Sequence, residues 1–202
     1  SNYRENYVEV PDNNEPISVT PLYTDAGFWK VFTFRFLHGK PFTQADIDAK
    51  RREVVLPVSV ARKLFATDDV VGRRFNMDAQ EYRVCGVVED VSAATPSSVG
   101  DMWLPITLNS WVTSDATGKL VGSVGIYMTA PDAEDKEALK EEVREVFRKL
   151  NLASDKYMND LMGQPDDYWA STFRFDSCSA PDLASELRIC LLYTSPSPRD
   201  TR

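Results

Sequence analysis

The sequence predicts an α+β protein, and two stretches carry that prediction. The first runs from Arg52 to Val91 and reads in order as strand, helix, turn, strand and strand. Apolar residues recur at helical spacing over 58–65, and the segments 73–77 and 81–88 alternate in character like a hairpin. The second is an amphipathic helix that begins at Pro131-Asp132, and its single apolar stripe comprises Leu139, Val143, Val146, Phe147 and Leu150. Such a stripe is typical of a helix that lies on a sheet.

Short elements are expected on the N-terminal side of Arg52. Apolar or alternating runs predict strands at 7–10, 17–23 and 34–37. A short helix is expected over 26–32, and one side of it is aromatic: Phe28, Trp29 and Phe32. We expect this side to be buried, and an aromatic ligand site is the alternative. Thr43 or Asp46 is expected to cap one further turn of helix.

Loops and strands are expected to alternate beyond Val91. By composition, residues 90–100 and 108–119 are loops, and the strand between them at 102–106 contains a proline, which predicts a position at the edge of a sheet. A long strand is expected at 120–130 and a final strand at 169–175.

Both ends of the sequence are interpreted as departures from the native protein. The chain begins at Ser1 without an initiator methionine, so we expect it to be an excised fragment whose flanking membrane segments lie outside it. Within it, no apolar run approaches the ~20 residues that a membrane helix needs. Leu191–Arg202 resembles the translated adapter sequence found at the ends of many metagenomic open reading frames. Residues 186–202 are therefore interpreted as a non-native tail.

The composition is acidic, with a formal net charge of −8 over 202 residues. This charge disfavours nucleic acid and anionic lipid surfaces as partners, because both attract basic proteins. Among the three cysteines, Cys85 lies in an apolar strand and is expected to be a small buried side chain. The sequence leaves open whether Cys178 pairs with another cysteine such as Cys190. The single histidine, His38, precedes a glycine at an expected turn and faces solvent in our interpretation.

The residue types that carry chemistry are present without the spacing that the chemistry needs. Glu89 and Asp90 are adjacent in a strand end, so they point to opposite faces and are poorly placed to share a substrate. The acidic residues Asp46, Asp48, Asp68 and Asp69 lack the spacing of a calcium loop, and Asp68-Asp69 is interpreted as part of a turn. Ser59 is in no nucleophile elbow, and no phosphate-binding glycine motif is present. We therefore expect no catalytic, cofactor-binding or metal-binding residues.

Three segments match one family pattern in order and spacing. The first combines aromatic residues with a glycine turn: Phe28-Trp29-Lys30-Val31-Phe32, Phe36-Leu37-His38-Gly39-Lys40-Pro41-Phe42 and Asp46. The second contains a strand, a helix and a turn: 54–65 and Val71-Gly72-Arg73-Arg74-Phe75. The third contains a glycine-bearing strand and a tryptophan: 82–90 and Trp103-Leu104-Pro105. As an ordered set, they resemble the MacB-like periplasmic core domain of certain ABC transporter permeases. Lys40 and Pro57 depart from the arginine and asparagine that are usual in the family, and both are expected in turns.

The resemblance implies an α+β fold with two lobes. Residues 1–37 and 119–185 would form a discontinuous α/β Porter-like lobe, and residues 38–118 would form an inserted, β-rich Sabre-like lobe. Gly39 and Gly72 would then allow tight turns, and Gly86 would allow close approach of two backbones.

The resemblance also implies a non-catalytic function at the inner membrane, with the domain facing the periplasm. Such a domain would couple ATP hydrolysis by an ATPase subunit or domain, through membrane helices, to a periplasmic protein or cargo, as in efflux, lipoprotein release or envelope maintenance. It would form homodimers, if at all, in the full-length permease. The alternatives are a free-standing secreted binding or adhesion module and, as a third hypothesis, an envelope enzyme that uses Glu89 and Asp90. The expected footprint of a partner is the loop from Asp90 to Gly100.

Overall fold

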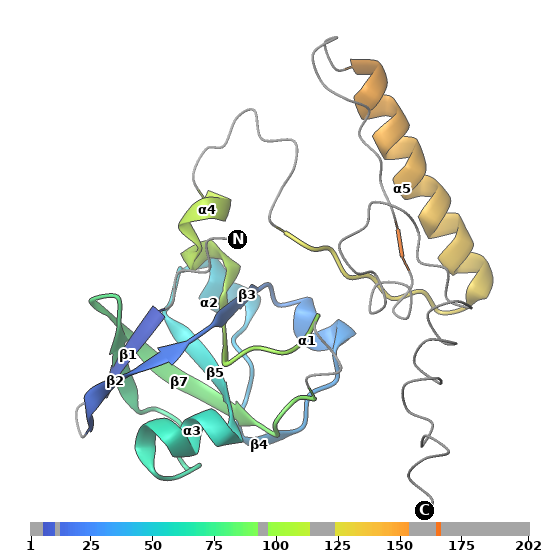
Figure 1. Ribbon diagram of the computed structural model, residues 1–202. Helices are drawn as coiled ribbons and strands as arrows, with labels where there is room; N and C mark the ends of the chain where they lie inside the picture. Colours follow the sequence, from blue (N-terminus) through green and yellow to red (C-terminus); the bar gives the residue numbers. More distant parts are fainter. Residues whose placement is uncertain (1–5, 11–12, 93–96, 114–123, 154–164, 167–202) are drawn as a thin grey trace, which may run out of the picture. The chain divides into compact units, whose positions relative to one another are not determined.

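The stretch from Arg52 to Val91 contains the elements that the sequence predicts: β5 (Glu53–Pro57), α3 (Val58–Phe65), β6 (Arg74–Met77) and β7 (Gln80–Val88) (Figure 1). The computed structural model describes residues 6–10, 13–92, 97–113, 124–153 and 165–166. Helix α3 and strand β6 lie in sequence between the parallel strands β5 and β7, and β6 pairs antiparallel with β7 across a two-residue turn. All five residues of β5 are buried, because the sheet is covered on both of its faces there.

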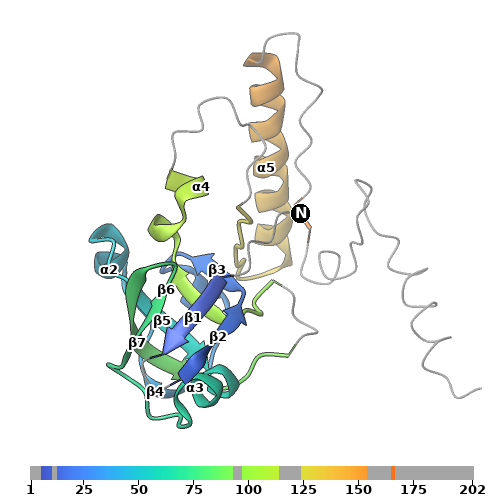
Figure 2. The ribbon, with the colours of Figure 1, turned by 60° about the vertical axis from the view of Figure 1, so that its left-hand side comes forward.

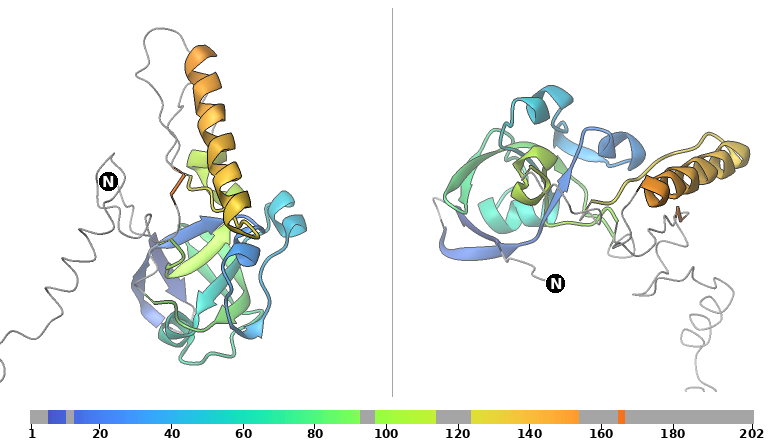
Figure 3. Two further views of the ribbon diagram at one scale, coloured as in Figure 1. Left: turned by 90° about the vertical axis from the view of Figure 1, so that its right-hand side faces the viewer. Right: turned by 90° about the horizontal axis from the view of Figure 1, so that it is seen from above.

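These strands form the middle of one mixed sheet, whose order is β2-β1-β6-β7-β5-β8-β3. The remaining strands are β1 (Asn6–Val10), β2 (Asn13–Val19), β3 (Pro21–Thr24), β4 (Phe36–Gly39) and β8 (Met102–Pro105). Strand β7 pairs with β6 through its first half and with β4 through its second half. Figure 2 shows the strands of this sheet from a second side, and Figure 3 shows from above how strongly the sheet curls. The α+β class expected from the sequence is therefore observed.

Two expectations about strands are wrong. The run 17–23 was expected to be one strand, but it changes strand at Thr20, and its parts β2 and β3 end up at opposite ends of the sheet order. Strand β8 was expected at an edge, but it lies between β5, with which it is antiparallel, and β3, with which it is parallel. Pro105 is compatible with this interior position because it is the last residue of the strand, where a missing N–H matters least.

Short helices flank the sheet. Helix α1 (Phe28–Val31) starts where Asp25 Oδ1 accepts the Phe28 N–H at 2.8 Å. Helix α2 (Gln44–Asp48) has a capping box formed by Thr43 and Asp46, as the sequence indicates. The 3-10 helix η1 (Ile106–Leu108) and helix α4 (Ser110–Thr113) occupy a region that was expected to be a loop.

The core consists of two clusters on the two faces of the sheet. The larger cluster includes Ala61 and Leu64 of α3 and is mainly aliphatic, and the rings of Phe75 and Tyr82 stack within it. The smaller cluster is aromatic and contains Phe28, Phe42 and Trp103, which are all buried. The aromatic side of α1 is thus part of the core.

Two glycines fix the contact between β4 and β7. Gly39 has φ +67°, and a Cβ at this position would lie 2.2 Å from the Cys85 carbonyl oxygen. A Cβ on Gly86 would lie 2.8 Å from the carbonyl oxygen of Lys40. The expected turn at Gly39 and the expected close approach at Gly86 are both confirmed, and the turn at Gly72 has φ +87°.

The chain divides into two units, Ser1–Met128 and Thr129–Arg202. In the second unit, α5 (Ala133–Ala153) confirms the amphipathic helix, and Asp132 Oδ1 accepts the Asp135 N–H at 2.8 Å at its start. Its charged face carries ion pairs three residues apart, including Glu137–Lys140, Glu141–Arg144 and Glu145–Arg148. Residues 124–130 form no strand, so the strand expected at 120–130 is wrong over its described part. The strand expected at 169–175 lies outside the described residues.

The pairing of strands bears on the expected two-lobe division without settling it. Strands β1 to β3, which precede residue 37, share one sheet with β4 to β8. Most of residues 119–185 lie outside the described ranges. The boundaries at residues 37 and 118 therefore stay a prediction.

Candidate functional site

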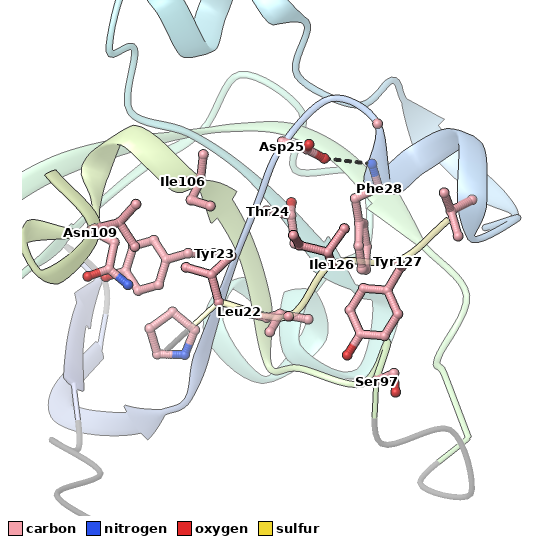
Figure 4. Close-up of a pocket in the computed structure, with 16 residues that line it drawn as sticks. Leu22, Tyr23, Thr24, Asp25, Phe28, Ser97, Ile106, Asn109, Ile126 and Tyr127 are labelled. Atoms are coloured by element: carbon pink, nitrogen blue, oxygen red, sulfur yellow. Dashed lines mark hydrogen bonds between the residues drawn. The ribbon is translucent and has the colours of Figure 1, made fainter. Parts of the chain in front are cut away.

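An apolar pocket of about 390 Å³ opens in the first unit next to β3 (Figure 4). Its walls come from four segments that are distant in sequence: 21–28 with Val31, Ser97, 106–112 and 124–127. Strand β3 ends the sheet order, so the pocket adjoins the strand that has no further sheet neighbour among the described residues. The pocket is therefore a product of the tertiary fold and of no single motif.

The aromatic cluster supports the inner side of this pocket. The Phe28 ring packs against Trp29, Phe32 and Phe34 with centroid distances of 5.4, 4.8 and 5.5 Å. Tyr127 joins the cluster through an edge contact with Phe32 at 5.2 Å. The segment 124–127 is thus held on the cluster by one aromatic side chain. Ile126, which precedes Tyr127 in sequence, has 79% of its surface exposed.

The loop in which a partner footprint was expected reaches the same pocket. Ser97 lines the pocket, and the carbonyl oxygen of Ser98 accepts the indole N–H of the buried Trp103 at 3.2 Å. Asp101 fixes the end of the loop, because its backbone N–H donates to the Thr20 carbonyl and its carboxylate accepts the Thr20 N–H. The described C-terminal part of this loop is therefore anchored to the sheet.

A second pocket, of about 670 Å³, is lined by charged groups from α2, β5 and β7. Arg83 donates from Nε and Nη2 to the carboxylate of the buried Glu53 at 3.0 and 2.6 Å. Arg51 donates to Asp46 at 2.9 Å. Hydrogen bonds from Thr43, followed by Arg51, lower the pKa of the Asp46 carboxyl. These four charges neutralise one another in two pairs, and Lys40 adds a fifth charge to the lining.

Cys85 borders the second pocket and is part-buried, whereas the sequence predicts a buried side chain. Its thiol donates to the Val54 carbonyl at 3.3 Å, and burial raises its pKa to about 12. A thiol with such a pKa is almost entirely protonated at neutral pH, so it is a poor nucleophile and a poor metal ligand.

The other residues considered for chemistry have separate structural partners. Glu89 accepts from Arg35 at 2.7 Å, whereas Asp90 accepts the backbone N–H of Ser59 at 3.0 Å near the start of α3. Asp68 accepts from Arg62, and this hydrogen bond lowers the pKa of the Asp68 carboxyl. The fold therefore does not bring these carboxylates together.

His38 and Asp69 also lie apart from any such cluster. His38 is part-exposed and lies 3.8 Å from Asp68. Asp69 accompanies Asp68 in the expected turn, where its N–H donates to the Thr67 hydroxyl. No group of three histidine, cysteine or acidic residues in the described ranges is arranged to hold a metal ion.

The sequence did not predict the Glu53–Arg83 pair or the pocket. The two partners of the pair sit opposite each other in the parallel register of β5 and β7. A prediction of that strand pairing would have placed them together. The pocket offers no comparable signal, because its walls are set by long-range packing.

The fold is a curled mixed sheet flanked by short helices, and a comparison with protein families shows the class of domain to which it belongs. Residues 2–146 match the family described as the MacB-like periplasmic core domain. The chain belongs to this family and is the periplasmic domain of a MacB-like ABC transporter permease. No curated protein sequence matches it.

Solved structures with the same fold come from several bacteria. The periplasmic region of MacB from Actinobacillus actinomycetemcomitans is 18% identical with a TM-score of 0.54, and the alignment covers 73% of this chain and 63% of that one. The extracellular domain of the noncanonic ABC-type transporter YknZ from Gram-positive bacteria is 18% identical (TM-score 0.52, 74% and 71% covered). A domain of a permease protein from Porphyromonas gingivalis is 17% identical (TM-score 0.53, 80% and 76% covered). The chain thus spans less than two thirds of the MacB periplasmic region.

Within the described part of the chain, no helix combines the length and the apolar character needed to cross a membrane.

Proposed function

We propose that this domain carries out no chemistry and transmits movement of membrane helices to a partner or cargo outside the membrane. The helices would belong to a permease of the inner membrane and would be driven by its ATPase subunit or domain. The partner would be a periplasmic protein or a cargo in efflux, lipoprotein release or envelope maintenance, and the full-length permease is the form in which we expect a homodimer.

The observation that supports this proposal best is the continuity of the sheet. The strands nearest the start of the described chain pair with residues far along it, β1 with β6 and β3 with β8. A displacement of the N-terminal segment is therefore passed directly to both ends of the sheet order through backbone hydrogen bonds. The sheet is tightly packed, with Trp103, Phe75 and Leu56 fully buried, so it moves as a body.

The partner footprint belongs, in our proposal, to the loop Asp90–Gly100. Its described end is fixed to the sheet through Ser98 and Asp101, so force applied to the loop reaches β8 and β3. The two-lobe arrangement, with an inserted lobe at 38–118, would place this loop in the Sabre-like lobe.

A decoupling experiment in the full-length permease tests this proposal. A flexible ten-residue Gly/Ser linker inserted just before β1 lets the membrane segment move without moving the sheet. We expect the variant to hydrolyse ATP at its normal rate and to fail to complement a strain that lacks the permease. The matched control carries the same linker in the exposed β6–β7 turn at Asp78-Ala79, where insertions are well tolerated.

Full complementation by the linker variant would refute mechanical coupling. Saturable ATP binding by the present chain alone would equally contradict a domain without nucleotide chemistry. The secreted-module hypothesis is tested by the gene on either side of this sequence, since a permease requires apolar runs of about 20 residues there.

A further inference from the structure

We propose that the second pocket binds a small monocarboxylate with a short aliphatic part, held by the ammonium of Lys40 and by unused N–H groups of Arg51 and Arg83. The inference goes beyond mechanical coupling and does not depend on it, because a coupling domain requires no small-molecule site.

The first argument is the size and position of the pocket. Its volume of about 670 Å³ lies within the range of small-molecule sites, roughly 300–1,000 Å³. Its walls come from the turn after β4, the start of α2, residues 51 and 53, the turn at 71–72 and residues 83–85 of β7. All of these segments belong to the described range 13–92. The strand pairing around β7 therefore holds the walls in place.

The second argument is the balance of charge. The lining carries three cations and two carboxylates, which leaves one positive charge: Lys40, Arg51 and Arg83 against Asp46 and Glu53. The two carboxylates are paired with the two arginines, whereas the Lys40 ammonium forms no ion pair with a described residue. A monoanion would balance the remaining charge. A dianion such as phosphate would be repelled by the two carboxylates.

The third argument is that the donors of Arg83 are already oriented. Its Nε donates to both carboxylate oxygens of Glu53, at 3.0 and 3.2 Å, and its Nη2 donates to Oε1 at 2.6 Å. The Glu53 side chain is only 8% exposed and lies opposite Arg83 in the register of β5 and β7, so it fixes the guanidinium. Nη1 of Arg83 has no hydrogen-bond partner among the described residues. A guanidinium held in this way loses little freedom when it donates to a carboxylate.

Arg51 offers further donors at the same pocket. Only its Nη1 is used by a described side chain, in the hydrogen bond of 2.9 Å to Asp46 Oδ1. Its side chain is 62% exposed, so the remaining N–H groups are open to a ligand from solvent. Hydrogen bonds from arginine to a carboxylate are charge-assisted and frequently bidentate.

The fourth argument is an apolar part of the lining. Pro41 and Val71 lie beside the charged groups, and the Val71 side chain is 44% exposed. An aliphatic group placed against Val71 would remove apolar surface from water. The lining therefore favours a carboxylate with a short aliphatic part over a fully polar acid.

An NMR titration of the present chain with isocaproate tests the assignment. Isocaproamide is the matched probe, since it has the same shape without the charge. We expect isocaproate to bind at least about tenfold more tightly, because its hydrogen bonds to the three cations are charge-assisted. The backbone amide shifts of Lys40, Arg51 and Arg83 should follow the binding curve. Equal affinity for the two probes, no saturable shift, or tighter binding of inorganic phosphate than of isocaproate would overturn the proposal.

A peptide pair distinguishes two sources of the carboxylate. The probes are an acetylated alanyl-alanyl-leucine with a free C-terminus and the same peptide with an amidated C-terminus. Binding of the free-acid peptide at least as tight as that of isocaproate would identify the carboxylate as the end of a peptide chain. Binding of isocaproate alone would identify it as a free acid, and binding of neither would overturn the proposal.

Variants of Lys40 locate the binding. Lys40→Gln removes the unpaired cation and keeps the backbone N–H that donates to the Cys85 carbonyl at 3.1 Å, so the fold should be retained. We expect isocaproate to bind about five- to tenfold more weakly and isocaproamide to bind as before. Lys63→Gln removes an equal charge at an exposed position outside the lining and should change neither. Equal weakening by both substitutions would show a general charge effect and overturn the proposal.

Arg51→Gln provides a second, independent test. It removes a donor and also leaves the Asp46 carboxylate unpaired in the pocket, so isocaproate should again bind about tenfold more weakly. The matched control is Arg35→Gln, which leaves Glu89 unpaired outside the lining and should not change the affinity. Unchanged binding of isocaproate by Arg51→Gln would refute the assignment to this pocket.

Discussion

Substitution of Gly39 by alanine tests how β4 is held against β7. The new Cβ would lie 2.2 Å from the Cys85 carbonyl oxygen, a backbone atom, so the strands would have to separate by about 0.8 Å to reach 3.0 Å, still a very tight contact. The separation would break the hydrogen bond from the Lys40 N–H to the same oxygen, now 3.1 Å long.

Three costs add up at this position. A left-handed backbone costs an L-residue about 1–2 kcal/mol. A lost backbone hydrogen bond costs about 1 kcal/mol, and local repacking about 1–3 kcal/mol. We expect Gly39→Ala to lower the free energy of unfolding by about 3–6 kcal/mol in total.

Gly72→Ala is the matched control. Gly72 also has a positive φ, of +87°, but a Cβ there would meet nothing within 4 Å. Only the backbone cost of about 1–2 kcal/mol should appear. Urea unfolding followed by tryptophan fluorescence measures both variants, since Trp29 and Trp103 lie in one aromatic cluster. Equal destabilisation by the two substitutions would refute the steric argument.

Three further predictions concern polar groups. Arg83→Gln should destabilise the chain by about 2–3 kcal/mol in urea unfolding, because it leaves the buried carboxylate of Glu53 unpaired. Glu53→Gln should cost only about 1 kcal/mol, because the exposed guanidinium of Arg83 stays hydrated. A larger cost for Glu53→Gln than for Arg83→Gln would contradict this. Hydrogen bonds from Thr43 lower the pKa of Asp46 in the folded chain. The Asp46 carboxylate therefore adds its full contribution to the free energy of unfolding above the unfolded pKa of about 3.9, and this contribution is lost as pH falls through the lower folded pKa. Asp46→Asn should therefore destabilise at pH 7 and approach wild-type stability near pH 2, and a pH-independent difference would exclude this linkage. The third prediction concerns the Cys85 thiol, measured in a chain whose other two cysteines are replaced by serine. Cys85 should react with Ellman's reagent at pH 8 about 1,000-fold more slowly than in the denatured chain, since its pKa is raised to about 12. A rate near that of the denatured chain would show that the thiol is accessible.

Local patterns predicted most elements of the first unit. The strand–helix–hairpin over 53–88 is encoded by contiguous periodicity, and the capping box at Thr43 and Asp46 is a short-range signal. The break at Thr20 was missed because the residues on both sides alternate alike. The interior position of β8 was missed because the sequence does not show that the strand ends at Pro105; only the pairing with β3 reveals this end.

The candidate sites were less predictable. The pocket beside β3 has no local signal, because Thr24 shares it with Ile106 and Ile126, which lie about 80 to 100 positions further along the chain. The separation of Glu89 from Asp90, by contrast, could be argued from spacing alone. The fates of Glu89 and Asp90 agree with that argument, since each has a different structural partner.

The order of strands in the sheet has a consequence for how the chain folds during synthesis. Strand β1 finds its second neighbour only when residues 76–77 have been made, and β3 finds β8 only at residues 102–105. The segment 53–88 can form its own contacts before β8 is made, since β5, α3, β6 and β7 are neighbours in sequence. Pairing between strands that are far apart in sequence, as in β1–β6 and β3–β8, slows folding. The nascent chain can pair β1 with β2 at once, but the other edge of β1 stays open until β6 emerges and β3 stays unpaired until β8 emerges. In these periods the open strands are exposed to a chaperone or to mispairing.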